Sequence, residues 1–361
     1  MVRVVMVEDS PVMRQLLHYI LDSGGIQIVG EAVDGEEAIP LVTRLRPDLV
    51  LMDINMPRLN GYQTTRRLMS ESPVPIVLVT ASLDPRDAVV AMQGLEAGAV
   101  AVVQKPRGLQ HAEFEQDAAE LLRVVSNMAQ VKVVRRIYRD PAASRMEVVN
   151  GREKRLVVIG SSTGGPAALH EMLKELRPDP PWPLLLVQHI TRGFLPSFCD
   201  WLSEFCPIPV TIAVQNELVC SGRLYLAPDD CHLGVQTDRA SGGFRIQLDS
   251  SEPWQGQRPA VGHLFASAAE VAAGSCIAIL LSGMGKDGVA QMLQLRQQGA
   301  LTLAQDQASS VVHGMPGEAL KCGAAKHALS PREIAWVLNE LGARQNVAVS
   351  QLDDGLKGQP R

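Results

Sequence analysis

The chain has 361 residues, a hydrophobic fraction of 46% and a formal net charge of -5, which fits two ordinary globular domains, since a domain commonly takes about 100–200 residues. The mild charge, without long runs of one sign, argues against nucleic acid as a partner. Its apolar runs are far shorter than the ~20 residues of a membrane-spanning helix, and Glu8 and Asp9 come too early for a secretory signal. We therefore expect a soluble, cytoplasmic protein without direct membrane insertion.

The first domain begins with short apolar runs that alternate with segments of helical spacing. Strands are predicted at residues 3–7, 26–32, 48–52, 75–79 and 99–103. Segments of helical spacing, such as 13–21 and 86–95, lie between them. Strands that alternate with helices predict an α/β fold with a doubly wound parallel sheet of the flavodoxin-like kind.

Polar residues follow the ends of these predicted strands. They are Glu8, Asp9, Asp53, Thr80 and Lys105. The carboxyl ends of parallel strands share one edge of the sheet, so these side chains are expected to converge there. Three carboxylates in one crevice repel each other and favour a hard cation such as Mg²⁺. With the lysine and the hydroxyl, the set is typical of phosphoryl transfer to a carboxylate, here Asp53.

Residues 1–127 resemble a response-regulator receiver domain. The matching segments are Val-Glu-Asp-Ser-Pro at 7–11, Asp-Ile-Asn-Met-Pro at 53–57, Gly61, Thr80-Ala-Ser and Lys105-Pro106. The resemblance implies that a sensor histidine kinase phosphorylates Asp53 and that Thr80 and Lys105 form the receiver switch. It implies Mg²⁺ ligands at Glu8, Asp9, Asp53 and the Asn55 carbonyl, with Glu8 in place of the commoner aspartate. It also implies a cis peptide bond before Pro106.

The middle and the end of the chain show weaker patterns. Residues 111–125 have helical spacing and are predicted to form the last helix of the receiver domain. Residues 128–154 lack a strong period and are predicted to be a linker. The second domain is then expected at 155–345, followed by a flexible tail at 346–361.

The second domain opens with a strand, a glycine-rich turn and a helix. The strand is predicted at 155–159, the helix at 167–176, and the turn between them reads Gly-Ser-Ser-Thr-Gly. This matches Gly-x-Ser-x-Gly in its strand–turn–helix context, which exposes the Ser162 hydroxyl beside a helix N-terminus. A phosphate-binding turn uses the same dipole, but the Gly-x-Gly-x-x-Gly pattern and a Walker lysine are missing here.

Two further strands bring possible partners for Ser162 to the same edge of a second, Rossmann-like sheet. His189 follows the strand at 184–188, and Asp287 lies in the glycine-rich loop after 277–281. His189 would act as the base and Asp287 would orient it, with backbone N–H groups at Thr163 and Met284 as oxyanion donors.

Other acids compete with Asp287 for the role of orienting the base. They are Asp229, Asp230 and Asp306. Asp306 is the nearest rival because it follows the predicted strand at 300–304. The order serine, histidine, aspartate differs from that of α/β-hydrolases, which argues against their fold but leaves the chemistry intact.

Residues 155–340 resemble the catalytic domain of chemotaxis receptor-glutamate methylesterases, the CheB family. The matching segments are 160–166, Gln188-His189, 225–228, His232-Leu233, Arg258-Pro259, Leu264-Phe265, 282–288 and 314–316. The resemblance implies a phosphorylation-regulated serine esterase with Ser162, His189 and Asp287 as its triad. One departure is Gly262-His263, where the family often has an acid.

The resemblance also implies a substrate and partners. The substrates would be glutamate γ-methyl esters on methyl-accepting chemotaxis receptors, hydrolysed to glutamate and methanol without a cofactor, and many relatives also deamidate receptor glutamines. The unphosphorylated receiver domain would cover the Ser162 cleft until Asp53 is phosphorylated. Two other hypotheses stay open: a receiver-linked protein-binding module, and an esterase that serves a small molecule or a sensory pathway other than chemotaxis.

Overall fold

The computed structural model describes residues 1–81, 85–131, 133 and 155–357. These residues form two compact units, one built from the N-terminal part of the chain and one from most of the remainder. Most of the predicted linker, residues 132 and 134–154, lies outside the described residues. Each unit is described below by itself.

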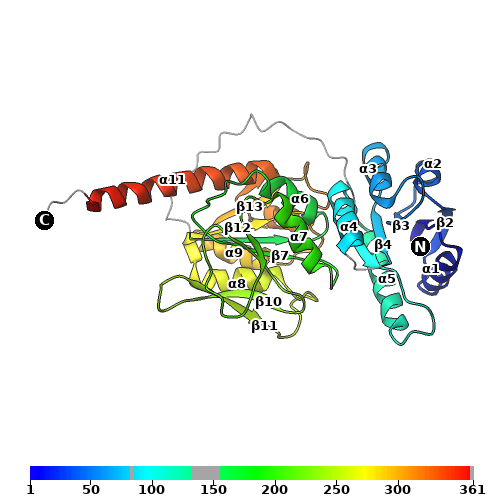
Figure 1. Cartoon of the computed structure of the whole chain (residues 1–361), viewed down its shortest axis with the longest axis horizontal. Helices are drawn as coiled ribbons and strands as arrows, with labels where there is room; N and C mark the ends of the chain where they lie inside the picture. The colour runs from blue at the N-terminus through cyan, green and yellow to red at the C-terminus, as the bar shows by residue number, and fades with distance from the viewer. Residues whose placement is uncertain (82–84, 132, 134–154, 358–361) are drawn as a thin grey trace. The chain divides into compact units, whose positions relative to one another are not determined.

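The N-terminal unit is a five-stranded parallel sheet between two layers of helices (Figure 1). Its strands are β1 (Arg3–Val7), β2 (Gln27–Ala32), β3 (Leu49–Asp53), β4 (Ile76–Thr80) and β5 (Ala101–Gln104). The helices are α1 (Pro11–Ser23), α2 (Gly35–Leu45), α3 (Gly61–Glu71), α4 (Pro85–Ala97) and α5 (Phe114–Met128). Helix α1 contacts α5 on one face, and α2, α3 and α4 follow one another on the other. The strand order β2-β1-β3-β4-β5 is that of the flavodoxin-like fold.

Local sequence explains where the elements of this unit begin and end. Every residue of β3 and β4 is buried, as expected for strands covered on both faces. Side chains cap the helices that follow the strands: Ser10 accepts a hydrogen bond from the N–H of Met13 in α1, and Asp34 accepts from two N–H groups of α2. The helices therefore start just beyond the strand ends.

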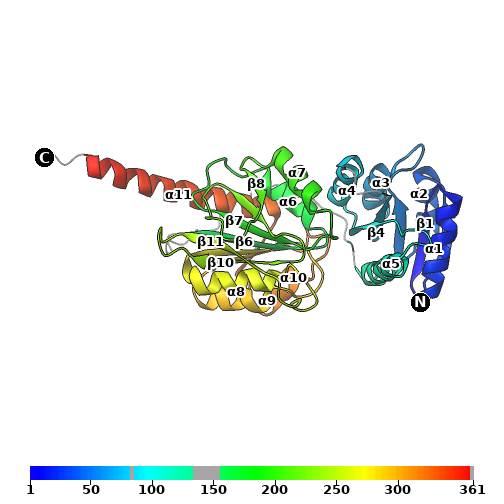
Figure 2. The ribbon, with the colours of Figure 1, turned by 60° about the horizontal axis from the view of Figure 1, so that its bottom comes forward.

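The second unit is built on a seven-stranded parallel sheet. Its strands are β6 (Leu156–Ser161), β7 (Leu184–Gln188), β8 (Val210–Ile212), β9 (Leu224–Leu226), β12 (Cys276–Leu280), β13 (Leu301–Gln305) and β14 (His327–Leu329). Its helices are α6 (Gly165–Leu173), α7 (Leu195–Phe205), α8 (Val261–Val271), the short η1 (Ala273–Ser275), α9 (Val289–Gln297), α10 (Met315–Lys321) and α11 (Pro331–Lys357). Figure 2 shows α8, α9 and α10 on one face of the sheet and α6, α7 and α11 on the other.

The strand order of the second sheet places a crossover at its centre. The order is β14-β13-β12-β6-β7-β9-β8, so β6 lies between β7 and β12 although β12 is far along the chain. The chain leaves β6 toward one edge and later returns to its other side. Such a switch point leaves a crevice at the carboxyl ends of the central strands, where ligands of α/β proteins bind. An antiparallel hairpin, β10 (His232–Thr237) with β11 (Phe244–Asp249), packs against α8.

The fold class predicted from the sequence is confirmed, with differences in detail. Helix α11 runs to Lys357, into the stretch assigned to a flexible tail, and no proline or glycine lies between Gly342 and Gly355 to end it. The expected cis bond before Pro106 is wrong, because the cis bond of the described residues is Arg258–Pro259. None of the described helices is long and apolar enough to cross a membrane.

Candidate active site

Ser162 and His189 follow directly after neighbouring strands. In the parallel pairing of β6 with β7, Ser161 lies opposite Gln188, so the next residues on each strand also lie side by side. The backbone N–H of His189 donates to the Ser161 carbonyl at 3.0 Å, which extends the pairing by one step. The strand register therefore brings a hydroxyl and an imidazole together at the carboxyl edge of the sheet.

The turn that carries Ser162 requires glycine at two positions. Gly164, the residue before α6, has a φ of 76°, which favours glycine. A Cβ on Gly165 would lie 2.3 Å from the Gln188 Oε1 and 2.9 Å from the Ser161 Cβ. The N–H of Ser162 donates to the Ser282 carbonyl at 3.0 Å. The turn is thus held tightly between β7 and the loop after β12.

Gln188 bonds to the backbone of both residues that carry the hydroxyl and the imidazole. Its Oε1 accepts from the Ser161 hydroxyl at 2.6 Å, and its Nε2 donates to the carbonyl of Ser162 at 2.9 Å and to that of His189 at 2.7 Å. The side chain is buried. Sequence reasoning placed Gln188 at the end of a strand and in a segment that matches the family, but gave it no role, although an amide at the end of an apolar strand is a signal for one.

Asp287 is the acid that meets His189. Its Oδ2 lies 3.0 Å from the His189 Nε2 and accepts from the N–H of Val261 at 2.7 Å, while its Oδ1 accepts from the N–H of Gly262 at 2.8 Å. Burial on its own raises the pKa of this carboxyl, but the His189 contact and the two N–H groups together hold its pKa below the usual value. Asp287 is therefore a stable carboxylate with one oxygen facing the imidazole.

Asp306, the nearest rival of Asp287, is engaged elsewhere. Its Oδ1 accepts from the N–H of Ser309 at 2.8 Å and from the Ser309 hydroxyl at 2.6 Å. These bonds close a local turn after β13. The rival therefore caps a turn, whereas Asp287 contacts the base.

The glycine-rich loop 282–288 packs against the serine turn. A Cβ on Gly283 would lie 2.8 Å from the Ser162 Cβ, and the Gly283 carbonyl accepts from the N–H of Met315 at 2.8 Å. The Ser282 hydroxyl donates to the Thr163 carbonyl at 2.8 Å. Met284, at the tip of the loop, is 37% exposed. The two residues predicted as oxyanion donors, Thr163 and Met284, thus belong to loops that adjoin Ser162, and their role stays a prediction.

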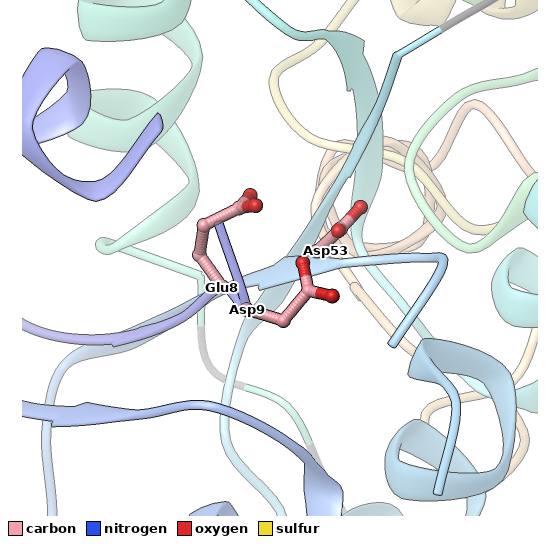
Figure 3. Close-up of side chains that lie close together, drawn as sticks. All are labelled: Glu8, Asp9 and Asp53. Atoms are coloured by element: carbon pink, nitrogen blue, oxygen red, sulfur yellow. The ribbon is translucent and has the colours of Figure 1, made fainter. Parts of the chain in front are cut away.

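A second constellation lies in the N-terminal unit, where Glu8, Asp9 and Asp53 form the acidic cluster of Figure 3. One ligand oxygen from each of the three side chains lies within 4.8 Å of the others. Burial raises the pKa of both Glu8 and Asp53 above its usual value, although the ion pairs with Lys105 oppose this shift. The Lys105 ammonium lies 2.8 Å from the Glu8 Oε2 and 2.8 Å from the Asp53 Oδ2.

The acidic cluster suits a small divalent cation. Glu8 and Asp53 are almost fully buried, and carboxylate oxygens in that setting need more positive charge than one lysine supplies. Mg²⁺ prefers such oxygen ligands and keeps some of its waters. Thr80 is fully buried at the end of β4, and the N–H of Asn55 donates to the Asp53 Oδ1 at 3.3 Å. All the residues predicted for this edge of the sheet therefore lie at strand ends or in the loops that follow them.

These features define a class of protein: a phosphoacceptor-type domain joined to a parallel-sheet domain with a serine, a histidine and an aspartate at its central crevice. Residues 4–113 match the model of the response regulator receiver domain, and residues 157–338 match that of the CheB methylesterase. The chain belongs to the CheB methylesterase family.

Similar proteins span nearly the whole chain. A "Protein-glutamate methylesterase/protein-glutamine glutaminase 3" of Hahella chejuensis is 48% identical over 347 residues, covering 94% of this chain and 98% of the relative. A "Protein-glutamate methylesterase/protein-glutamine glutaminase 1" of Syntrophus aciditrophicus is 42% identical, and the match covers 94% of this chain and 98% of that relative. The crystal structure of the Thermotoga maritima CheB methylesterase catalytic domain matches with 36% identity and a TM-score of 0.51, over 52% of this chain and 99% of that domain.

Proposed function

We propose that this chain hydrolyses glutamate γ-methyl esters on methyl-accepting chemotaxis receptors and that it also deamidates receptor glutamines. The similar proteins bear the name of both activities. The observation that carries the proposal is the His189–Asp287 pair beside Ser162 at one strand edge. Both reactions are acyl transfers from a glutamyl group, so one serine with one base serves for either.

The proposed reaction has two steps. The Ser162 oxygen attacks the ester carbonyl carbon while His189 takes the hydroxyl proton, and the C–O bond to methanol then breaks as His189 returns that proton to the leaving oxygen. Water next attacks the glutamyl ester of Ser162, again with His189 as base, and releases glutamate. Since Nε2 of His189 bonds to Asp287, Nδ1 is the nitrogen that faces Ser162 in this scheme. The N–H groups of Thr163 and Met284 would stabilise the oxyanion.

The acidic cluster supports control by phosphorylation. In this proposal a sensor histidine kinase transfers a phosphoryl group to Asp53, and Glu8, Asp9, Asp53 and the Asn55 carbonyl hold Mg²⁺, which neutralises charge on the phosphoryl oxygens. Lys105 holds the carboxylates in place before transfer and can then bind the phosphoryl group. The receiver domain at 1–127 would regulate the catalytic domain at 155–345, and both would work in the cytoplasm.

The deciding experiment measures methanol release from methylated receptor by the full chain and by the Ser162→Ala variant. We expect the variant to lose at least about a thousandfold in rate, because the nucleophile is gone. Undiminished release would disprove the proposal. A chain that reacts with a fluorophosphonate probe but releases no methanol from chemotaxis receptors would be an esterase of another pathway, and one that fails to react would be a binding module.

A further inference from the structure

His232 is a fully buried histidine at the start of β10. Its Nδ1 accepts a hydrogen bond from the N–H of Ala260 at 3.1 Å, and its Nε2 lies 3.2 Å from the Glu252 carbonyl. A carbonyl only accepts, so Nε2 carries the proton and Nδ1 keeps its lone pair. The two bonds therefore fix one tautomer of a neutral ring.

Ala260, which donates its N–H to His232, lies at the start of helix α8, and the next two residues of this helix bind Asp287. Ala260 is the N-cap of α8, and the next two residues, Val261 and Gly262, donate their N–H groups to the two Asp287 oxygens. The first N–H groups of a helix have no acceptor within the helix. Three consecutive N–H groups are thus bound by side chains from outside α8, one by His232 and two by Asp287.

We propose that His232 is a positioning residue for the reaction: through Ala260 it holds residues 260–262 where they orient the Asp287 carboxylate toward His189. This inference rests on the proposed function. A series of hydrogen bonds joins the Glu252 carbonyl to the His232 ring and the ring to the start of α8. The first residues of α8 bond to Asp287, which contacts His189. A shift of residues 260–262 would move the carboxylate, and small shifts of this kind have large effects on rate.

The surroundings of His232 keep its ring neutral, so that Nδ1 can accept the hydrogen bond from Ala260. Its ring stacks on that of His263, with centroids 4.8 Å apart and 14° between the planes, and Trp254 lies 5.2 Å from His263. Burial lowers the pKa of His232, so the ring stays neutral near pH 7. A protonated ring would point an N–H at the N–H of Ala260, and the bond would be lost.

Two substitutions of similar size separate this role from a merely structural one. The amide oxygen of asparagine takes the position of a histidine Nδ1, so His232→Asn keeps an acceptor for Ala260. The amide of glutamine reaches the position of Nε2, so His232→Gln keeps a partner for Glu252 and loses the acceptor for Ala260. His232→Phe, which keeps the stacked ring without nitrogens, replaces the glutamine variant if that variant does not fold. His327→Asn is the matched control, because His327 lies on β14 at the edge of the sheet.

Two readouts are needed, both on the full chain below the melting temperature of every variant. The first is kcat and KM for methanol release as a function of pH. We expect His232→Gln to lower kcat about 10- to 100-fold with KM nearly unchanged, and His232→Asn to stay within about threefold of the wild type. The second is the proton NMR signal of the His189 Nε2–H that faces Asp287, assigned with a His189→Gln variant, which requires no substrate.

The direction of the second readout follows from Asp287. Its carboxylate accepts the hydrogen bond of the His189 Nε2–H, so a misplaced carboxylate lengthens or breaks this bond. We expect this proton signal to move upfield or to disappear through exchange with water in His232→Gln, and to stay in place in His232→Asn and in His327→Asn. An unmoved signal in a folded His232→Gln variant, or equal losses of kcat in the asparagine and glutamine variants, would overturn the inference.

Failure of the inference and failure of the proposed function give different results. If Ser162→Ala releases methanol as fast as the wild type, the proposed function is wrong, whatever the His232 variants do. If Ser162→Ala is inactive and the His189 proton signal of His232→Gln matches that of the wild type, the proposed function stands and the positioning role is disproved.

Discussion

At the scale of single residues, the site depends on two buried polar side chains whose polar atoms have hydrogen-bond partners. Gln188 makes one bond through its oxygen and two through its nitrogen, and Asp287 accepts from two N–H groups and contacts His189. Buried polar networks of this kind fix one geometry, because every alternative leaves a donor or an acceptor without a partner. Groups that react must be held in this way if the barrier is to fall.

Gln188→Met tests the buried amide that links Ser162 to His189. Methionine fills a similar volume but removes the Gln188 bonds of the Ser161 hydroxyl and the His189 carbonyl. The Ser162 carbonyl loses the amide as well but keeps the N–H of Gly165 as a donor. We expect a loss of about 1–3 kcal/mol in the free energy of unfolding and a fall of about 10- to 100-fold in kcat.

The check for Gln188→Met combines denaturant unfolding with the methanol assay. Ser161→Ala is the control, since it removes a single one of the three bonds and should cost only about 1 kcal/mol. If Gln188→Met keeps the wild-type kcat, the amide has no part in placing the two groups.

At the scale of elements, the strand–turn–helix unit from β6 to α6 carries the hydroxyl, and its pattern of apolar residues and glycines is recognisable in the sequence. Two glycines of this unit serve to leave room for neighbouring side chains. Gly165 leaves room for the Gln188 amide, and Gly160 leaves room for Val261, whose Cγ1 would lie 2.3 Å from an added Cβ. The turn can therefore pack against β7 and α8 only if these two positions are glycine.

Gly165→Ala is expected to disturb the packing of the serine turn. The added Cβ would lie 2.3 Å from the Gln188 Oε1, so the amide must move and the Ser161 bond is lost. We expect a fall in kcat of about 10-fold or more and a lower melting temperature. Gly108→Ala is the control, because nothing lies within 4 Å of its added Cβ. A Gly165→Ala variant with unchanged kcat would show that the turn tolerates the shift.

At the scale of the whole molecule, one domain is expected to control the other through a chemical change at Asp53. Acetyl phosphate with Mg²⁺ should raise the rate of methanol release by the full chain, and EDTA should remove the increase while the basal rate persists, because the acidic cluster and the hydrolytic residues belong to different domains. Asp53→Asn should remove the increase as well, since it lacks the attacking carboxylate. An increase that survives in Asp53→Asn would mean that another residue accepts the phosphoryl group.

The stability of the molecule should depend on fully and partly buried histidines of the second unit. Burial lowers the pKa of His232, His313 and His327. The unfolded chain binds protons at about pH 6.5, where the folded chain does not, so stability is present above this pH and is lost as the pH falls below it. We expect the melting temperature to fall between about pH 7 and pH 5, and to fall less steeply in His327→Asn. An equal slope in the variant would contradict the assignment.

Sequence patterns by themselves determined the fold class and the elements that carry the chemistry. Continuous apolar runs marked strands β3, β4 and β7, since strands buried on both faces need them, and polar residues directly after such runs marked the edge where ligands bind. Short, partly polar strands such as β8 and the hairpin of β10 and β11 gave no such signal.

Only the tertiary structure showed which acid contacts the base, and only it revealed the supporting residues. Asp287 lies 98 residues from His189, and its N–H donors lie 26 and 25 residues away, so its place after a strand does not by itself distinguish it from Asp306, although the family resemblance favoured it. The contacts of Gln188 and His232 likewise depend on strand order and on the packing of α8. Short stretches of sequence are enough to predict local propensity and burial, whereas a hydrogen bond between distant residues exists only after the chain has folded.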